Sequence, residues 1–426
     1  MDSIFILGRN PLLSNAEIAS VFRVQPQALT GEVCSLSAEL SETSARQLFL
    51  RLGGSIKLAV VDCKVAVTAL GQTLQSSVAA IAQLAEGKIA VGASVYGTSQ
   101  LQASIAKVLL EIKRVQRSQG HAFRVVTSRE PILSSVVVAK NHLLDRGREF
   151  IIIRSQKSEI GSQNVAFRYP TSDLRPLILG HTLAVQDFEG QSSRDYGRPR
   201  RDPRRGILPI QLARILVNLA LPKPGGTLLD PFCGIGTILQ EALLLDHEVI
   251  GSDIDPKAIE DSRANLEWLA ARTNTAVIPS EPCELRDLAG SYTFIQSDIR
   301  ELPAKLRDQP IDAIVTEAPL GPPLSHQPTI KQISALRADL VPLYEQAFAV
   351  FAKLLRPGGR LVIALPIWRV GNTMHYALDS LEAITKYGFI IPDLFHGTRY
   401  KVQARGFTYG RPDQHVWREI VVCERI

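Results

Sequence analysis

The chain has 426 residues, of which 45% are hydrophobic and 21% are charged, and its net charge is +6. These values exclude an intrinsically disordered chain, and the length predicts two or three domains, because one hydrophobic core rarely organises so many residues. No run of about 18 apolar residues predicts a membrane helix, and the five scattered cysteines form no C-x-x-C pair that would predict a metal site or a disulfide framework. We therefore expect a cytoplasmic protein with no membrane contact and no metal.

Residues 1–60 predict a small module of mixed α and β structure. A strand is expected at residues 4–7, followed by a helix over residues 15–22 with Ser14 as its N-cap. A second helix is expected around residues 41–53, where Gly53 and Gly54 would end it. Residues 61–165 again alternate strands with helices, and the longest predicted helix covers residues 99–120.

The stretch from residue 166 to residue 205 is rich in Arg, Asp, Gly and Pro and has no periodicity, which predicts a linker. Its arginines cluster in the sequence RDYGRPRRDPRR, from Arg194 to Arg205. Such a concentrated positive charge attracts a polyanion, although it is also compatible with a solvated linker. Both interpretations remain open at this point.

Residues 206–426 alternate short apolar strands with helices, which predicts an α/β fold with a mostly parallel sheet covered on both faces. The apolar runs near residues 393–397 and 419–425 predict an antiparallel hairpin at the edge of this sheet. The expected strands lie at residues 227–230, 248–253, 293–298, 312–317 and 360–365, and the expected helices at 208–221, 236–245, 256–271, 335–354 and after residue 365.

The first of these strands runs directly into the sequence DPFCGIGTI, residues 230–238. Ligands of open parallel sheets bind beyond the carboxyl ends of the strands, and glycines in the first strand-to-helix turn allow close approach to the backbone. Gly234 and Gly236 occupy that turn. The dinucleotide fingerprint is incomplete, because Leu239 stands where its third glycine belongs, so a nicotinamide cofactor is disfavoured.

Acidic residues end the first three strands. Asp253 is placed to accept hydrogen bonds from both ribose hydroxyls of an adenosine ligand, and Asp298 from its adenine amino group. Asp230 is placed to hold an ammonium group, because a buried charge requires a partner. The alternative interpretation is that Asp253 and Asp298 are helix N-caps.

This block resembles the class I S-adenosylmethionine-dependent methyltransferases, especially the branch that modifies nucleic acids and whose first motif reads D-P-F-C-G-x-G-T. The resemblance extends over nearly the whole chain to the THUMP-domain tRNA guanosine N2-methyltransferase family, and it is strongest for a bacterial-type subgroup. The matching segments besides DPFCGIGT are residues 126–153, 184–209 and 408–420.

The resemblance implies a Rossmann-like class I methyltransferase domain at residues 206–426, preceded by an α+β ferredoxin-like module at 1–60, a THUMP RNA-binding domain at 61–165 and the Arg-rich linker at 166–205. It implies S-adenosylmethionine as cofactor and tRNA as partner, and it leaves open whether a protein partner is needed. The implied cofactor-binding residues are Asp230, Phe232, Gly234, Gly236, Thr237, Asp253, Ile254, Asp298 and Ile299. The expected RNA-binding residues are Lys107, Lys113, Arg114, Arg117, Arg198, Arg200, Arg201, Arg204 and Arg205.

Enzymes of this type carry an Asp-Pro-Pro-Tyr-like motif after the fourth strand, which implies Glu317, Ala318, Pro319 and Leu320 as the catalytic residues here. The motif is divergent, because Glu is longer than Asp and Leu cannot stack on a base as an aromatic ring does. Neighbouring residues that could replace the ring are Tyr344, Trp368, His326, Pro322 and Pro323. We expect a tRNA (guanine-N2) methyltransferase; the alternatives are a catalytically weak or inactive RNA-binding member, or a methyltransferase acting on another exocyclic amine in RNA or DNA.

Overall fold

The computed structural model describes residues 2–84, 87–128, 130–155, 175–201, 208–273, 290–394 and 405–426. The chain divides into two compact units. The first contains Met1–Pro11, Pro26–Phe49 and Ser55–Phe188, and the second contains Leu12–Gln25, Leu50–Gly54 and Glu189–Ile426. The second unit therefore includes two short N-terminal segments as well as the whole C-terminal part of the chain.

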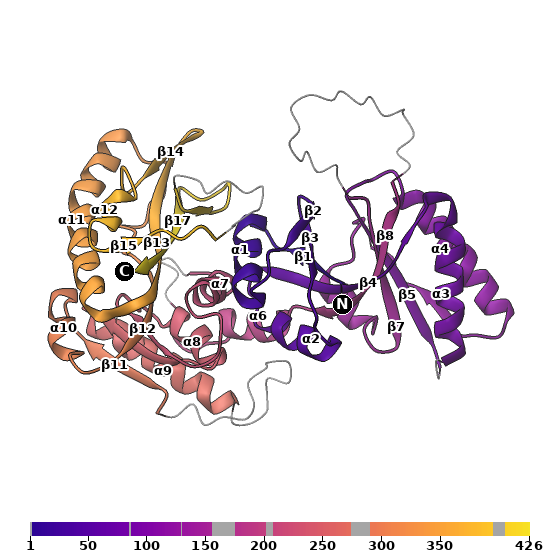
Figure 1. Cartoon of the computed structure of the whole chain (residues 1–426), viewed down its shortest axis with the longest axis horizontal. Helices are drawn as coiled ribbons and strands as arrows, with labels where there is room; N and C mark the ends of the chain where they lie inside the picture. The colour runs from indigo at the N-terminus through magenta and orange to yellow at the C-terminus, as the bar shows by residue number, and fades with distance from the viewer. Residues whose placement is uncertain are drawn as a thin grey trace. The chain divides into compact units, whose positions relative to one another are not determined.

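The first unit is built on an eight-stranded sheet of described residues with the order β2-β3-β1-β4-β8-β7-β5-β6. Only β5 pairs in parallel, with β6 and β7, and the remaining neighbours are antiparallel. The strands are β1 (Asp2–Leu7), β2 (Gln27–Thr30), β3 (Val33–Ser37), β4 (Ser55–Val65), β5 (Ile89–Tyr96), β6 (Phe123–Val125), β7 (Gly147–Ile153) and β8 (Leu177–Val185). The helices are α2 (Glu42–Leu50), η1 (Val67–Ala69), α3 (Leu70–Leu84), α4 (Gln102–Ser118) and α5 (Ser135–Lys140); α3 and α4 bury their apolar faces in one core with β5 and β7 (Figure 1).

Two of the domain assignments predicted from sequence overlap strands of this sheet. The boundary after residue 60 falls inside β4, which pairs with β1 on one side and β8 on the other. The predicted linker at 166–205 contains β8 and the helix α6 (Phe188–Tyr196). Its residues 166–174 and 202–205 lie outside the described residues. One continuous sheet thus spans the stretches predicted as a ferredoxin-like module and a THUMP domain, and these two assignments stay predictions.

The second unit contains the predicted Rossmann-like α/β fold, and its sheet has the order β11-β10-β9-β12-β13-β17-β15. The first five of these strands are mutually parallel, and β17 returns antiparallel to β13. In the described part of this unit the strands are β9 (Thr227–Asp230), β10 (Glu248–Asp253), β11 (Tyr292–Gln296), β12 (Ile311–Glu317), β13 (Leu355–Val370), β14 (Thr373–Tyr376), β15 (Phe389–Ile390), β16 (Phe407–Tyr409) and β17 (Val416–Arg425).

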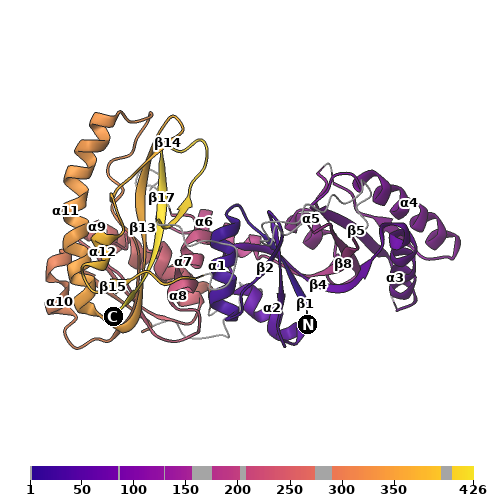
Figure 2. The same cartoon turned by 45° about the horizontal axis from the view of Figure 1, so that its top comes forward.

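Helices cover both faces of this sheet, as expected for a parallel sheet (Figures 1 and 2). One face packs against α7 (Ile210–Ala220), α8 (Thr237–Leu244) and α9 (Pro256–Thr273). The other face packs against η3 (Ile299–Glu301), α10 (Leu302–Lys305), α11 (Ile330–Leu354) and α12 (Glu382–Thr385). None of the helices in the described ranges is long and apolar enough to cross a membrane.

The C-terminal third differs from the prediction in three details. The long helix α11 begins at Ile330 instead of residue 335, because Thr329 and Gln332 form a capping box. The helix expected after residue 365 is the short α12, which begins only at Glu382, since β13 continues to Val370 and turns at Gly371, with φ of 60°, into β14. The predicted antiparallel pairing of residues 419–425 is confirmed in β17, but its partners are β13, β15 and β16, and most of residues 393–397 lie outside the described residues.

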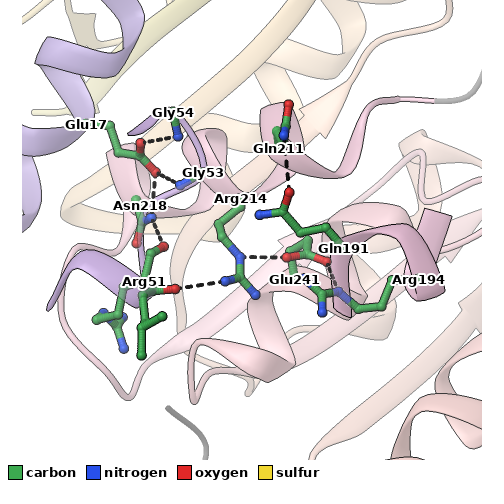
Figure 3. A network of polar contacts seen from close by, with 11 residues as sticks. Glu17, Arg51, Gly53, Gly54, Gln191, Arg194, Gln211, Arg214, Asn218 and Glu241 are labelled. Carbon is green, nitrogen blue, oxygen red and sulfur yellow. Dashed lines mark hydrogen bonds and ion pairs between the residues drawn. The ribbon is translucent and has the colours of Figure 1, made fainter. Parts of the chain in front are cut away.

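The helix α1 (Pro11–Phe22) belongs to the second unit, and Ser14 is not its cap. The helix starts before Ser14, whose buried hydroxyl donates to the carbonyl of Gly54 at 2.8 Å. Glu17, one turn further along, accepts from the backbone N–H groups of Gly53 and Gly54 and from the amide of Asn218 in α7, each at 2.8 Å (Figure 3). These bonds attach α1 and the Gly53–Gly54 turn to α7.

A second buried carboxylate, Glu241 of α8, continues this network (Figure 3). Its two oxygens accept from the Nε atoms of Arg194 in α6, at 2.8 Å, and Arg214 in α7, at 2.7 Å. Arg214 also donates to the carbonyl of Leu50 at 3.0 Å. Because breaking either ion pair inside the core is costly, Glu241 fixes α6, α7 and α8 to one another.

Glu17 predicts a pH-dependent stability. Burial raises its pKa from 4.5 to about 7, although the hydrogen bonds from Gly53, Asn218 and Gly54 oppose the shift. Between these pH values the folded protein holds a proton that the unfolded chain has released, so the free energy of unfolding falls as the pH rises. Glu17→Gln removes this titration. From the lower to the higher of these pH values, the free energy of unfolding of the wild type should therefore fall relative to that of the variant by on the order of 3 kcal/mol.

Denaturant unfolding at several pH values between 4.5 and 8 measures this difference. The exposed Glu42→Gln variant is the matched control for loss of one carboxylate. A difference between wild type and Glu17→Gln that stays constant with pH would contradict the prediction.

Candidate functional site

A pocket of about 560 Å³ opens beyond the carboxyl ends of β9, β10 and β12. Its wall brings together residues from the glycine turn, from three strand ends and from the segment after β12, which are far apart in the chain. Of the predicted site residues, the lining includes Asp230, Phe232, Gly234, Thr237, Asp253, Ile254, Asp298, Ile299, Glu317, Ala318, Pro319 and Leu320, and Gly236 alone of the predicted cofactor and catalytic residues is not part of it. Sequence reasoning missed Arg300 and Gln346, which also line the pocket.

The two glycines of the turn have different tasks. Both have positive φ, 53° at Gly234 and 80° at Gly236, a region that disfavours other residues. A Cβ on Gly236, the residue before α8, would lie 2.8 Å from Ser262 Oγ, so the helix packing requires its absence. A Cβ on Gly234 would meet no atom within 4 Å and would enter the pocket.

Asp230, at the end of β9, is a buried carboxyl without a cation. It is 2% exposed, and its Oδ1 accepts from Thr316 Oγ1 at 2.7 Å and from the Phe232 N–H at 3.3 Å. Burial raises its pKa to about 7, against these two hydrogen bonds, and the nearby Asp253 and Glu317 charges add to the rise. Among the described residues no cationic side chain pairs with it, so a positively charged ligand group would stabilise its ionised form.

The other two predicted acids are held differently. Asp253 accepts from the N–H of Gly234 with one oxygen and from the N–H of Asp255 with the other, both at 3.0 Å, which links it to the glycine turn. Asp298 is bound by the Nε and Nη2 atoms of Arg300 at 2.9 and 2.7 Å, and hydrogen bonds from Arg300 lower its pKa to about 2. Asp298 also caps η3, so the N-cap interpretation holds for this residue.

The segment after β12 is clamped from both sides. The Ala318 N–H donates to the Ala364 carbonyl at 3.0 Å, and the Tyr344 hydroxyl donates to the Pro319 carbonyl at 2.5 Å. Burial raises the pKa of Tyr344 above its ordinary value, so the hydroxyl stays a donor. The Glu317 carboxylate accepts a hydrogen bond from Arg418 Nε. Sequence reasoning missed Arg418, which lies 101 positions away, and assigned Tyr344 a different task.

The stacking role suggested for Tyr344 and Trp368 is wrong. Both side chains are fully buried, Tyr344 in α11 under the Pro319 carbonyl and Trp368 in β13, and neither ring offers a face to the pocket. Their apolar bulk is needed in the core between α11 and the sheet. Pro322, Pro323 and His326 are exposed, and Leu320 itself lines the pocket.

The structure overturns one RNA-binding prediction in the Arg-rich segment. Arg198 is 3% exposed, and its Nη1 donates to Thr237 Oγ1 at 2.8 Å, so it supports the start of α8 and cannot face a phosphate. Arg200 is exposed beside Asp261, at 3.6 Å, and Arg201 is exposed over the Tyr196 ring. The predicted Arg204 and Arg205 lie outside the described residues.

The four remaining predicted cations lie on α4 of the first unit. The helix buries Ile105, Leu109, Ile112 and Gln116, and helical periodicity puts two of the cations opposite this face and two at its flanks. Those cations are Lys107, Lys113, Arg114 and Arg117, of which Lys113 is half-buried and the others are exposed. In the ranges that the structure describes, no cluster of three or more His, Cys, Asp and Glu residues is arranged to hold a metal ion.

Comparisons with known proteins agree with this geometry. A family model described as "RMKL-like, methyltransferase domain" matches residues 198–370. The chain is 32% identical over 142 residues to the probable tRNA (guanine(10)-N2)-dimethyltransferase of Methanothermococcus thermolithotrophicus, covering 78% of that protein and 33% of its own length. The chain belongs to the tRNA guanine-N2 methyltransferase family.

Two further members and one solved structure extend this comparison. The tRNA (guanine(10)-N2)-dimethyltransferases of Methanothermobacter thermautotrophicus and Methanocaldococcus jannaschii are 37% and 29% identical over 34% and 42% of the chain, which spans 36% and 48% of their lengths. The chain therefore spans half or less of these two relatives. The crystal structure of TrmN from Thermus thermophilus covers both chains completely with a TM-score of 0.51 and 17% identity, which shows that the fold is shared.

The glycine turn predicts two different responses to a methyl group. Each positive φ costs an alanine about 1 to 2 kcal/mol. In Gly236→Ala the new Cβ also collides with Ser262, so unfolding by denaturant should show a clearly larger loss of stability than in Gly234→Ala, whose Cβ enters open space. Equal losses in the two variants would contradict the assignment of Gly236 to helix packing.

Proposed function

We propose that this protein transfers a methyl group from S-adenosylmethionine to the N2 amine of a guanosine in tRNA, at position ten. The observation that carries the proposal is one pocket whose wall combines the acids at three strand ends with the segment from Glu317 to Leu320. The printed names of the relatives, tRNA (guanine(10)-N2)-dimethyltransferases, support the same substrate and position.

The residues at the cofactor end fit S-adenosylmethionine. Asp230 supplies a buried carboxyl without a cation, which suits the ammonium group of the methionine part. Asp253 suits the ribose hydroxyls, and the side chain of Ile254, which is 66% exposed in the pocket wall, suits one face of the adenine ring. The open space at Gly234 lets the ligand approach the backbone. When bound, S-adenosylmethionine supplies an electrophilic methyl group on a sulfonium.

The segment after β12 has the groups that orient an amine. The lone pair of an exocyclic amine is delocalised into the base, so acceptors for its protons localise the lone pair and aim it. Glu317 and the Ala318 carbonyl are the proposed acceptors, and Leu320 packs against the base. The absence of an aromatic ring at Leu320 forfeits roughly 1 to 3 kcal/mol of stacking, which places more of the burden of positioning on the acceptors.

Binding of tRNA is proposed to rest on phosphate contacts from two groups of cations. The first group lies on α4 and consists of the exposed Lys107, Arg114 and Arg117 and the half-buried Lys113. The second is the Arg-rich segment, where Arg200 and Arg201 are exposed and Arg204 and Arg205 follow. Arg198 is removed from the predicted set because it is buried. Contacts of this kind release counterions, so the affinity falls with salt.

Asp230 predicts that S-adenosylmethionine binds more tightly as the pH rises toward and through about 7. The carboxyl must be ionised to pair with the ligand ammonium, so each pH unit below its pKa weakens binding by up to about tenfold. Asp230→Asn should bind weakly and without this dependence, whereas Asp253→Asn should bind weakly with the dependence intact. Calorimetry between pH 5.5 and 7.5, where the ligand amine stays protonated, measures both. A wild-type affinity that is flat with pH would refute the role of Asp230.

Methyl transfer is tested directly with purified protein, an unmodified tRNA transcript and S-adenosylmethionine. Nucleoside mass spectrometry should detect N2-methylguanosine or its dimethyl form, and replacing guanosine ten by adenosine should abolish the product. Glu317→Ala should lower turnover by about 100-fold, as expected for loss of an oriented acceptor. A wild type that binds tRNA and cofactor but methylates no tRNA would support the alternative of a non-catalytic RNA-binding member.

A further inference from the structure

Arg418 contacts the proposed catalytic carboxylate. It lies near the start of β17, its side chain is 6% exposed, and its Nε donates to Oε1 of Glu317, which is 17% exposed. The guanidinium is therefore largely shielded from water, and its partner Glu317 lines the pocket. An ion pair so shielded from solvent is held much more firmly than a surface pair.

The topology explains how Arg418 reaches this position. Glu317 ends β12 and is level with Ala364 of β13, while Pro366 of β13 is level with Arg418 of β17. Because β17 runs antiparallel, its first residues lie at the edge where the parallel strands end. A parallel strand in that place would put its last residues there instead. The antiparallel direction of β17 thus places the Arg418 side chain beside Glu317 in the pocket wall.

The acidic residues of the pocket differ in whether an arginine pairs with them. Asp298 is paired with Arg300 and Glu317 with Arg418, whereas Asp230 and Asp253 have no ion-pair partner among the described residues. The two unpaired acids suit a cationic cofactor. Glu317 lines the same pocket, and because Arg418 balances its charge, the pair suits an uncharged guanine amine and does not attract a second cation.

We propose that Arg418 is a positioning residue for methyl transfer, which holds one oxygen of the longer Glu317 side chain and leaves Oε2 to accept a proton of the guanine N2 amine. This inference rests on the proposed function. The N2–carbon bond forms while the carbon–sulfur bond breaks, sulfur keeps the bonding electron pair, and the proton released from N2 passes by way of Glu317 to water. Arg418 removes the rotational freedom that the extra methylene of Glu317 brings.

The test compares Arg418→Met with Arg425→Met by steady-state kinetics. Arg425 lies on the same strand but donates to the carbonyls of Ala352 and Gly388, at 3.0 and 2.8 Å, so it is a control for a structural arginine. In Arg418→Met, kcat should fall by about 10- to 100-fold, with KM for tRNA and for S-adenosylmethionine changed by less than about twofold, because the residue acts on orientation. Arg425→Met should lower the melting temperature and leave kcat unchanged.

A double-mutant cycle separates positioning from general structure. In a Glu317→Ala background, Arg418→Met should cause little further loss of kcat, since the two residues act as one unit. If Arg418→Met does not fold, Arg418→Lys, which keeps the charge and loses the planar fork, takes its place in the same cycle with an intermediate loss.

Three outcomes overturn the inference. A full kcat in the folded Arg418 variant, or losses that add in the cycle, overturns the role of Arg418 while the proposed function stands. A wild type that methylates no tRNA overturns the proposed function and this inference with it.

Discussion

The second unit depends on the pairing of charges that are buried in it. Glu241 is fully buried in α8 and is tolerated there because Arg194 and Arg214 donate to both of its oxygens. Removing either arginine would leave one of these oxygens without that bond, and removing both would leave a charge that is expensive to bury. Since α8 begins at the glycine turn, these ion pairs also determine where Gly234 and Gly236 stand relative to the sheet, and Arg198 adds a further bond at Thr237. The pocket is therefore supported from behind by residues that never touch a ligand.

Charge pairing also distinguishes two carboxyl groups of the pocket wall. Asp230 is buried without a cation, and its raised pKa records the energetic cost of ionising it there. Glu317 in the same pocket wall is paired with Arg418. The unpaired carboxyl suits a positively charged group and the paired one a neutral hydrogen-bond donor, which fits the proposed cofactor and the proposed guanine amine. In the proposed reaction, Arg418 compensates for the greater length of the Glu317 side chain.

Much of the fold and nearly all of the candidate pocket could be predicted from sequence, because their signals are local. The bounds of β9 and β10 follow from apolar runs that end in Asp230 and Asp253, and Gly236 marks the turn between strand and helix. The rule that parallel strands present their carboxyl ends at one edge then brings the three acids together without knowledge of the helices. The start of the helix expected after residue 365 could not be predicted, because β13 pairs with both β14 and β17 and the helix α12 follows only at Glu382.

By itself, the amino-acid sequence determined the Rossmann-like fold, the glycine turn, the acidic strand ends and the family, since each is carried by residues that are adjacent or evenly spaced. Only the tertiary structure decided which charged and aromatic side chains are free to act. It buried Arg198 behind the pocket, turned Tyr344 into a clamp on Pro319, and joined Arg418 to Glu317 across 101 positions. The physical reason is that burial and ion pairing arise between distant segments, and no local pattern of residues records which partner a side chain will meet.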